Sequence, residues 1–293
     1  MELFRRNRTF ILLGSLPALV LYVLFVIYPI FRSFVYGFYE WNGLSEPTYV
    51  GLKNFQEILH DPVFWNSFRN NLLIVGVSIF GQIPIGLVLA VMLSRKFPGS
   101  GTYRSIFFIP MVLSTVVVAL LWSSLLNPQV GVVNQFLKQI GLGVLAMNWL
   151  GDMRTAMAVV CGVIIWQFSG LYMVIFLAAI QNIPKEIYEA CSLDGVSERA
   201  KLLHVTLPLL WPTVMASVVL CIAGSMRSFD LVYVMTEGGP AHATELMATY
   251  MYNKTFAVYK YGYGSAVAMV IFLLSFGMIL AGQILMKRKQ DTV

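Results

Sequence analysis

Charged side chains are scarce in this chain. Of its 293 residues, 12% are charged and 58% are hydrophobic, whereas soluble domains carry about 25% charged residues. So few charges cannot cover the surface of a soluble protein, and the composition therefore indicates an integral membrane protein. The net charge of +6 does not indicate a nucleic-acid binder, because the basic residues lie in short loops beside apolar runs and form no basic stripe.

The motifs that commonly mark an enzyme are absent as well. The sequence contains no G-x-x-x-x-G-K-[ST] phosphate loop, no G-x-G-x-x-G fingerprint and no H-E-x-x-H zinc motif. The chain therefore cannot hydrolyse ATP by the phosphate-loop route. Its three histidines and three cysteines show no spacing of a metal site or of a disulfide framework. We expect no catalytic residue, no metal and no cofactor in this chain.

Long apolar runs, in contrast, are frequent. A helix needs about 20 apolar residues to cross a membrane, and six runs reach that length: 10–31, 72–93, 105–126, 155–180, 207–226 and 261–286. The first run exceeds the roughly 7–15 apolar residues of a secretory signal, and no small-residue cleavage site follows it. We predict an all-α integral membrane protein with six transmembrane helices, and short helices at 52–60 and 132–140 in the connecting loops.

No Asp, Glu, Lys, Arg or His lies within these six runs. Carriers coupled to protons or ions commonly place ionisable residues in the membrane, so their absence predicts a different energy source. It also suits a path for a neutral, hydroxyl-rich solute, lined by amide, hydroxyl and aromatic groups. The candidates are Gln82, Trp166, Gln167, Ser169, Tyr172 and Ser225. The alternative role of each is packing and hydrogen bonding between helices.

Two charged residues follow at the end of the fifth run. Arg227 and Asp230 are three residues apart, so on a helix they would share a face and could form an ion pair. The pair would be either a simple interfacial contact or a polar mouth of the solute path.

The distribution of Lys and Arg predicts which side of the membrane each loop faces. Cytoplasmic loops carry an excess of these residues. The two terminal tails, loop 94–104 and segment 184–208 hold twelve of the twenty, three in each segment, whereas the longer loops on the other side hold eight. Both termini and segment 184–208 are therefore expected in the cytoplasm.

Segment 184–208 is far more polar than the two apolar runs that flank it. Pro184 suits the first turn of a helix, and Asp194 with Gly195 supplies a turn, because glycine tolerates positive φ. Ser197 can cap a second helix, which we expect to run until Pro208 disturbs it. The pattern predicts a two-helix hairpin that prolines stiffen at both ends.

The spacing in this hairpin resembles the EAA loop, the signature of permease subunits of binding-protein-dependent ABC importers. The family pattern is Glu-Ala-Ala, three residues, Gly, nine residues, a branched apolar residue, one residue and Leu-Pro. This chain departs from it only in Cys191 for the second Ala and Val205 for the usual Ile. The resemblance implies that the following residues form an ATPase-coupling loop: Glu189, Ala190, Cys191, Asp194, Gly195, Leu207 and Pro208.

A second stretch, FDLVYVMTEGGP at residues 229–240, resembles the outer-loop signature of the carbohydrate branch of these permeases. That branch serves oligosaccharides, polyols and glycerol phosphates. The following Thr244-Glu245 and the start of the last run at 263–266 also fit it. The chain looks more like the first of the branch's two partner permeases than the second. Which sugar is carried stays open: charge-free spans favour a neutral glycan, but Arg227 leaves room for an anion.

The resemblance implies a type I ABC importer permease fold in a bacterial or archaeal cytoplasmic (inner) membrane. Residues 1–67 would form the N-terminal tail, first helix and outer loop, residues 68–286 the permease core and residues 287–293 a cytoplasmic tail. Implied partners are a second permease, usually a different chain, two cytoplasmic ATPase subunits and an extracytoplasmic solute-binding protein. A secondary carrier or channel without an ATPase is the alternative, but it leaves the hairpin unexplained. A membrane enzyme would need clustered His, Asp or Glu.

Overall fold

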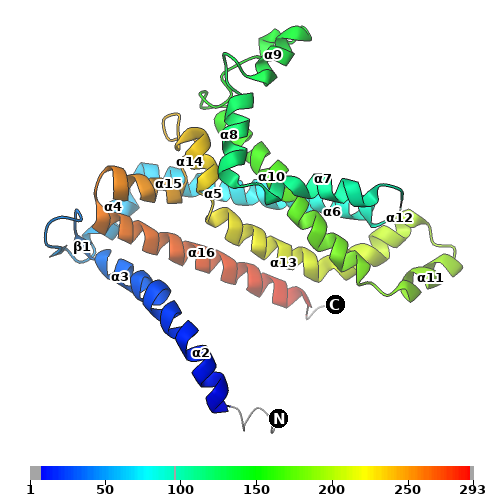
Figure 1. Cartoon of the computed structure of the whole chain (residues 1–293), viewed down its shortest axis with the longest axis horizontal. Coiled ribbons are helices and arrows are strands. Elements are labelled where there is room, and N and C mark those ends of the chain that lie inside the picture. The colour runs from blue at the N-terminus through cyan, green and yellow to red at the C-terminus, as the bar shows by residue number, and fades with distance from the viewer. Residues whose placement is uncertain (1–7, 96, 291–293) are drawn as a thin grey trace. The chain divides into compact units, whose positions relative to one another are not determined.

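The computed structural model describes residues 8–95 and 97–290 (Figure 1). Five helices in this part of the chain are long and apolar enough to cross a membrane, and six if the bent pair Ser100–Val112 and Thr115–Leu125 is one span. The predicted all-α membrane fold is confirmed. The basic residues expected before Arg8, and Lys96 in the 94–104 loop, lie outside the described residues. The chain divides into two compact units, one of Met1–Asp61 with Met251–Leu273 and one of Pro62–Tyr250 with Leu274–Val293.

The first unit contains the first apolar span, a small sheet and the beginning of the last span. In the sheet Tyr39 pairs antiparallel with Tyr49. Asn54, which is 6% exposed, holds the first strand by donating from Nδ2 to the carbonyls of Gly37 and Tyr39, each at 2.9 Å. The elements are α2 (Arg8–Tyr22), η1 (Val23–Ile27), α3 (Tyr28–Tyr36), β1 (Tyr39–Glu40), β2 (Thr48–Tyr49), α4 (Lys53–His60), η5 (Asn253–Ala257) and the start of α16 (Tyr261–Gln290).

The second unit contains the remaining spans and the polar hairpin. The short helix predicted at 132–140 is present here as α9, and the one predicted at 52–60 is α4 of the first unit. The elements of this unit are α5 (Pro62–Val77), η2 (Ser78–Gln82), α6 (Ile83–Ser94), α7 (Ser100–Val112), α8 (Thr115–Leu125), α9 (Val132–Gln139), η3 (Gly143–Leu145), α10 (Ala156–Gln181), α11 (Lys185–Leu193), α12 (Glu198–Lys201), η4 (Leu202–Thr206), α13 (Leu207–Met226), α14 (Asp230–Thr236) and most of α15 (Met247–Tyr252).

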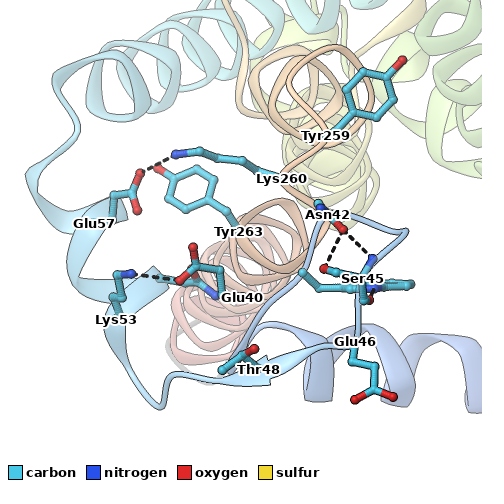
Figure 2. A pocket seen from close by; sticks show the side chains of 12 residues that line it. Glu40, Asn42, Ser45, Glu46, Thr48, Lys53, Glu57, Tyr259, Lys260 and Tyr263 are labelled. Atoms are coloured by element: carbon cyan, nitrogen blue, oxygen red, sulfur yellow. Dashed lines mark hydrogen bonds and ion pairs between the residues drawn. The ribbon is translucent and has the colours of Figure 1, made fainter.

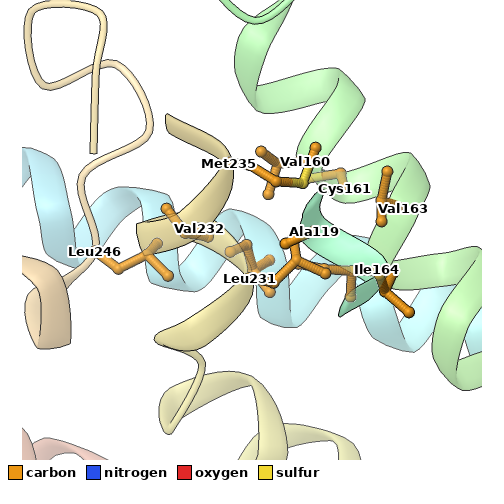
Figure 3. Close-up of a cluster of buried hydrophobic side chains, with 11 residues drawn as sticks. Ala119, Val160, Cys161, Val163, Ile164, Leu231, Val232, Met235 and Leu246 are labelled. Atoms are coloured by element: carbon orange, nitrogen blue, oxygen red, sulfur yellow. The ribbon is translucent and has the colours of Figure 1, made fainter. Parts of the chain in front are cut away.

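Helix α10 is central to the second unit, because it contributes to two large clusters of buried apolar side chains. One cluster joins α10 to α8 and α14, with Ala119 and Val232 fully buried (Figure 3). The other joins α10 to α6 and α13 around Phe176 and Cys221. A Cβ at Gly86 would lie 2.6 Å from the Cβ of Tyr172, so glycine is what allows α6 to pack closely on α10.

Prolines in three spans are accommodated by wide helical turns. A proline has no N–H and clashes with the carbonyl four residues before it. For Pro29, Pro84 and Pro208 that carbonyl lies within η1, η2 and η4, which are all π-helical. A π-helical turn bonds across five residues instead of four, which gives the carbonyl room. Each helix therefore continues past its proline.

The third span, which the sequence predicted as one helix at 105–126, is broken into two helices. Helices α7 and α8 meet at an angle of 95°, because Leu113 and Ser114 are extended, with ψ of 144° and 132°. Pro110 removes one hydrogen bond from the last turn of α7, and α8 buries Val118 and Ala119 in the cluster with α14. A weakened turn on one side and apolar packing on the other produce the bend seen in Figure 1.

Candidate functional site

A cavity of about 380 Å³ lies within the second unit, between α5, η2, α7, α8, α10 and α13. We call it the central cavity. Its volume falls in the range of about 300–1,000 Å³ that is typical of small-molecule sites. The wall is mostly apolar, and its polar side chains are Gln82, Thr115, Tyr172, Ser225, Arg227, Ser228 and Asp230. A largely apolar wall with a few polar groups is the composition expected of a site for a small solute.

Five of the eight residues predicted for the solute path line the central cavity: Gln82, Tyr172, Ser225, Arg227 and Asp230. Gln82 is 4% exposed and donates from Nε2 to Ser78 Oγ at 3.1 Å and to the carbonyl of Ile164 at 3.4 Å. Asn71 donates to the carbonyl of Ser225 at 3.3 Å. These bonds tie the second span to α10 and α13 and so fix the cavity wall.

The other three predicted path residues lie elsewhere. Trp166 stands two residues from Ile164 on α10, about 200° around the helix, and its ring contacts Trp122, with ring centroids 5.6 Å apart. Ser169 is buried and donates to the carbonyl of Trp166 at 3.5 Å. Gln167 is 1% exposed and donates to Thr115 Oγ1 at 3.4 Å, so it reaches the cavity only through Thr115.

Several cavity residues were not among the predicted ones. Thr115 follows the bend between α7 and α8, and Ser228 and Phe229 lie in the short connection between α13 and α14. Thr115 was not predicted because the third run was taken as one span, although Pro110 and the nearby Ser114 were a usable signal of a break. Phe168 lies on the same face of α10 as Ile164 and Tyr172, and its spacing from them was visible in the sequence.

The predicted ion pair between Arg227 and Asp230 is not formed. Helix α13 ends at Met226 with Arg227 as its C-cap, and a new helix starts at Asp230, so the two side chains do not share a helical face. Within the described residues neither side chain has an ion pair. Both are exposed at the edge of the central cavity, which leaves a cation and an anion free to meet a ligand.

The polar segment 184–208 folds as a hairpin of two helices. Gly195 adopts φ of +69°, and the amides of Val196 and Gly195 donate to the carbonyls of Cys191 at 3.0 Å and Ser192 at 3.2 Å. These two bonds are a Schellman motif, which requires a left-handed residue after the helix. Ser197 then caps the second helix by accepting from the amide of Ala200 at 3.3 Å. The predicted turn and cap are therefore present.

The two prolines of this hairpin lie somewhat differently from the prediction. Pro184 is the N-cap of α11, with ψ of 134°, and lies before the first turn. Pro208 does not end the second helix, because η4 precedes it and the helix continues from Glu198 to Met226. The second half of the hairpin is thus the beginning of the fifth span. This span carries Cys221 and Ser225 into the central cavity.

Side chains rather than prolines cross-link the hairpin. The Tyr188 hydroxyl lies 3.1 Å from Thr206 Oγ1, and Lys201 Nζ donates to Ser192 Oγ at 2.8 Å. Both contacts join α11 to the helix that follows it. Arg95, from the preceding loop, pairs with Glu198 at 2.9 Å. These contacts hold the two helices as one rigid element.

The outward face of the hairpin carries the residues of the predicted coupling loop. Glu189, Ala190 and Asp194 are exposed, and Cys191 is half-buried. Leu193, which precedes the turn, is 89% exposed. Leu207 and Pro208 lie at the start of α13 instead. The hairpin thus presents an exposed carboxylate, small side chains and an exposed leucine to its surroundings.

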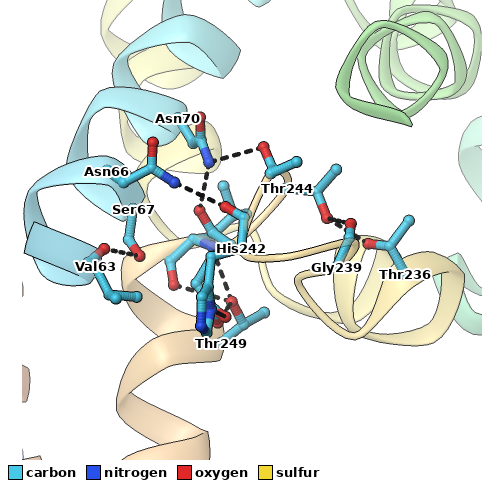
Figure 4. Close-up of polar contacts among 12 residues, drawn as sticks. Val63, Asn66, Ser67, Asn70, Thr236, Gly239, His242, Thr244 and Thr249 are labelled. Carbon is cyan, nitrogen blue, oxygen red and sulfur yellow. Dashed lines mark hydrogen bonds and ion pairs between the residues drawn. The ribbon is translucent and has the colours of Figure 1, made fainter. Parts of the chain in front are cut away.

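A buried polar network holds the loop that follows α14 (Figure 4). Glu245 is 2% exposed, and its carboxylate accepts from Thr249 Oγ1 at 2.6 Å and lies 2.8 Å from His242 Nδ1. Asn70 donates to the carbonyl of Glu245 at 2.9 Å, and Asn66 donates to that of His242 at 2.7 Å. The loop is thereby fixed to the second span. Among the described residues no group of three or more His, Cys, Asp or Glu is placed to bind a metal ion.

Apolar spans, a stiff polar hairpin and a cavity between the spans together define a membrane transport protein. The sequence profile of the family described as "binding-protein-dependent transport system inner membrane component" matches residues 82–290. The chain belongs to that family. Its membership agrees with the resemblance noted in the hairpin.

Individual relatives are similar along nearly the whole chain. The probable ABC transporter permease protein YurN of Bacillus subtilis (strain 168) is 38% identical, over 94% of this chain and 95% of that protein. The lactose transport system permease protein LacF of Rhizobium radiobacter is 35% identical, over 88% and 87%. A crystal structure of a bacterial ABC transporter involved in the import of the acidic polysaccharide alginate contains a chain with a TM-score of 0.85 at 21% identity, over 98% and 99%. The last comparison concerns the fold alone.

Proposed function

We propose that this chain is the permease subunit of an ABC importer that moves a sugar or a related polyol or oligosaccharide across the cytoplasmic membrane. One observation carries the proposal. A helix that is continuous from Glu198 to Met226 joins the exposed hairpin to the wall of the central cavity. A movement of the hairpin would therefore be transmitted to the solute path through one continuous helix. Family membership and the similarity to a lactose permease support the substrate class.

The proposal includes the partners that such an importer needs. Two cytoplasmic ATPase subunits would hydrolyse ATP, because this chain has no phosphate loop and would not itself be an enzyme. A second permease, a different but similar chain, would face residues 68–286, and an extracytoplasmic binding protein would deliver the solute. Both termini and the hairpin would lie in the cytoplasm, as the excess of Lys and Arg favours.

In the proposed mechanism, the ATPase holds the hairpin by its exposed face. Glu189 would pair with a basic residue of the ATPase, Ala190 and Cys191 would permit close approach, and Gly195 would shape the turn. ATP-driven closure of the ATPases would then switch the paired permeases between inward-open and outward-open states. Solute would cross along the central cavity, where Gln82, Tyr172 and Ser225 offer amide and hydroxyl groups and where Arg227 and Asp230 stand at the edge.

A charge reversal at Glu189 tests this coupling. The Glu189→Lys variant is assembled with its co-purifying subunits in liposomes, and ATP-dependent sugar uptake is measured. Loss of a central charged contact at an interface costs about 2 kcal/mol or more, so we expect uptake to fall at least about tenfold. Stability should not change, because the side chain is exposed. The matched control is Glu237→Lys, which reverses another exposed carboxylate on the opposite side of the predicted topology and should transport normally.

Two results would contradict the proposal. Normal ATP-dependent uptake by Glu189→Lys would remove the hairpin from the coupling mechanism. Purification of the chain without an ATPase, together with sugar movement in liposomes that needs no ATP, would replace the importer by a secondary carrier or channel.

A further inference from the structure

A second cavity, of about 450 Å³, lies in the first unit (Figure 2). We call it the loop pocket. It is formed by the segment from β1 to α4 and by the residues just before and within the start of α16, and it shares no residue with the central cavity. The proposed topology places both segments on the extracytoplasmic side, where solute arrives. Its lining residues are Glu40, Trp41, Asn42, Ser45, Glu46, Thr48, Lys53, Asn54, Glu57, Tyr259, Lys260 and Tyr263.

The walls of the loop pocket are fixed by hydrogen bonds within the unit. Asn42 Oδ1 accepts from the amide and the hydroxyl of Ser45 at 2.9 and 2.8 Å, and Trp41 Nε1 donates to the carbonyl of Ser45 at 2.9 Å. Gly262 allows α16 to start directly against the carbonyl of Tyr39, where a Cβ would clash. Asn54 uses Nδ2 for both of its recorded bonds, which leaves Oδ1 as an acceptor. The pocket is thus formed before any ligand arrives.

The charges of the loop pocket disfavour an anionic ligand. Lys53 pairs with Glu40 at 2.9 Å, and Lys260 pairs with Glu57 at 3.2 Å. Among the described residues, a third carboxylate, Glu46, has no ion pair, and Figure 2 shows it apart from both lysines. The lining therefore carries three carboxylates against two ammonium groups. The free acceptors suit the hydroxyl groups of an uncharged ligand.

Aromatic rings add apolar surface to these polar groups. The ring of Trp41 stacks on that of Tyr36, with centroids 4.7 Å apart and an interplanar angle of 26°. Tyr259 is 60% exposed and lies in the left-handed region, with φ of +59°. The turn around it is closed by the amide of Lys260, which donates to the carbonyl of Lys254 at 3.0 Å. Glycine usually occupies such a position after a helix, and strained residues of this kind concentrate at functional sites.

We propose that the loop pocket is a second ligand site, which binds the end of an uncharged oligosaccharide. The exposed Tyr259 ring would cover the apolar C–H face of a sugar, and Glu46, Glu57 and Asn54 would accept hydrogen bonds from its hydroxyl groups. The site is distinct from the central cavity and would hold a glycan at the extracytoplasmic surface. Only the choice of a sugar as ligand, and the side on which it binds, rest on the proposed function.

Binding to the purified full-length complex without its binding protein, in lipid nanodiscs, tests the site. Maltotriose and raffinose serve as uncharged probes and trigalacturonate as the anionic one, with affinity measured by calorimetry and sugar contacts by saturation-transfer NMR. We expect an uncharged probe to bind, and trigalacturonate to bind at least about tenfold more weakly, because of the excess carboxylate.

The decisive variant is Tyr259→Gly. Glycine adopts the left-handed backbone without strain, so the melting temperature should stay the same or rise, while sugar affinity should fall about tenfold through loss of the ring. Tyr259→Phe keeps the ring and should bind within about threefold of the original chain. Tyr49→Ala removes an exposed ring outside the pocket and should leave binding unchanged.

Three outcomes would overturn the inference. They are no binding of either uncharged probe, full affinity in Tyr259→Gly, and loss of affinity in Arg227→Ala instead, which would place the sugar in the central cavity. If the Tyr259→Gly complex bound the binding protein more weakly while its sugar affinity stayed unchanged, Tyr259 would be a protein contact, and the inference would also be overturned. ATP-dependent uptake by the same complex is measured in parallel. Normal uptake without sugar binding at the loop pocket would contradict the second site and leave the proposed importer function intact.

Discussion

Two of the polar segments that connect the apolar spans of the second unit place an acidic residue in opposite environments. In hairpin 184–208 the side chain of Glu189 is exposed and has no hydrogen bond or ion pair among the described residues. In the loop after α14 Glu245 is 2% exposed and contacts Thr249 and His242. The same chemical group thus serves as a free surface charge in one segment and as an internal anchor in the other.

Solvation explains this difference. An exposed carboxylate stays hydrated and needs no protein partner. A buried carboxylate must accept hydrogen bonds to offset the free-energy cost of its desolvation. The hairpin is therefore organised to be recognised from outside, and the loop after α14 is organised to keep the edge of the central cavity in place. In these two segments, the exposed Glu189 is available to a partner, and the buried Glu245 is part of the framework.

The largest expected effect comes from removing the buried acid. In Glu245→Ala, Thr249 and His242 lose their acceptor, and bonds to charged groups contribute about 1.5–3 kcal/mol. We expect unfolding free energy to fall by about 3 kcal/mol, measured from the melting temperature of the purified chain. Glu189→Ala should change it by less than about 0.5 kcal/mol. Equal melting temperatures of Glu245→Ala and Glu189→Ala would contradict the proposed difference between the buried and the exposed carboxylate.

A conservative pair of variants sharpens this test. Glu245→Gln keeps the shape and one acceptor oxygen, so it should lose about half as much stability as Glu245→Ala. Equal losses in the two would show that the shape of the side chain, and not its hydrogen bonding, holds the loop.

A smaller effect is expected at the turn of the hairpin. Gly195 has φ of +69° with open space around its Cα, so Gly195→Ala meets no neighbour but strains the backbone by about 1–2 kcal/mol. The control is Gly101→Ala in α7, also with open space, which should be neutral or stabilising because alanine is the better helix former. Melting temperatures of the two variants measure the difference. A stable Gly195→Ala would mean that the turn does not depend on the left-handed residue.

The smallest effect concerns the link between the two hairpin helices. Tyr188→Phe removes only the hydroxyl that lies 3.1 Å from Thr206 Oγ1, worth about 0.5–1.5 kcal/mol. We expect faster amide hydrogen exchange in α11 and a modest loss of coupled transport, with the spans unaffected. Unchanged exchange in α11 would argue that Lys201 and the turn alone keep the hairpin rigid.

Some features of the hairpin could be predicted from the sequence, and others could not. Asp194, Gly195 and Ser197 predicted the turn and the cap correctly, because a Schellman motif and an N-cap depend on neighbouring residues only. Pro208 was misread, because a proline ends a helix only where the preceding turn cannot widen. The sequence contains no local signal of the π-helical turn that makes room for Pro208.

The central cavity shows the same division. Gln82, Tyr172 and Ser225 were predicted to line the solute path because a polar side chain inside an apolar run can be recognised from the sequence alone. Trp166 was predicted for the same reason, but its position on α10 places its ring against Trp122 and away from the central cavity. Thr115 and Ser228 were missed, since both lie beside breaks whose direction depends on packing against α14.

Composition and spacing alone determined that this chain crosses a membrane, where its spans lie, how its hairpin turns and which family it belongs to. These properties follow from hydropathy and from contacts between residues close in the sequence. Only the tertiary structure decided that the third span bends by 95°, that one helix joins the hairpin to the cavity, and that Glu245 is buried while Glu189 is free. Those properties depend on which distant side chains meet, and a local pattern of residues does not contain that information.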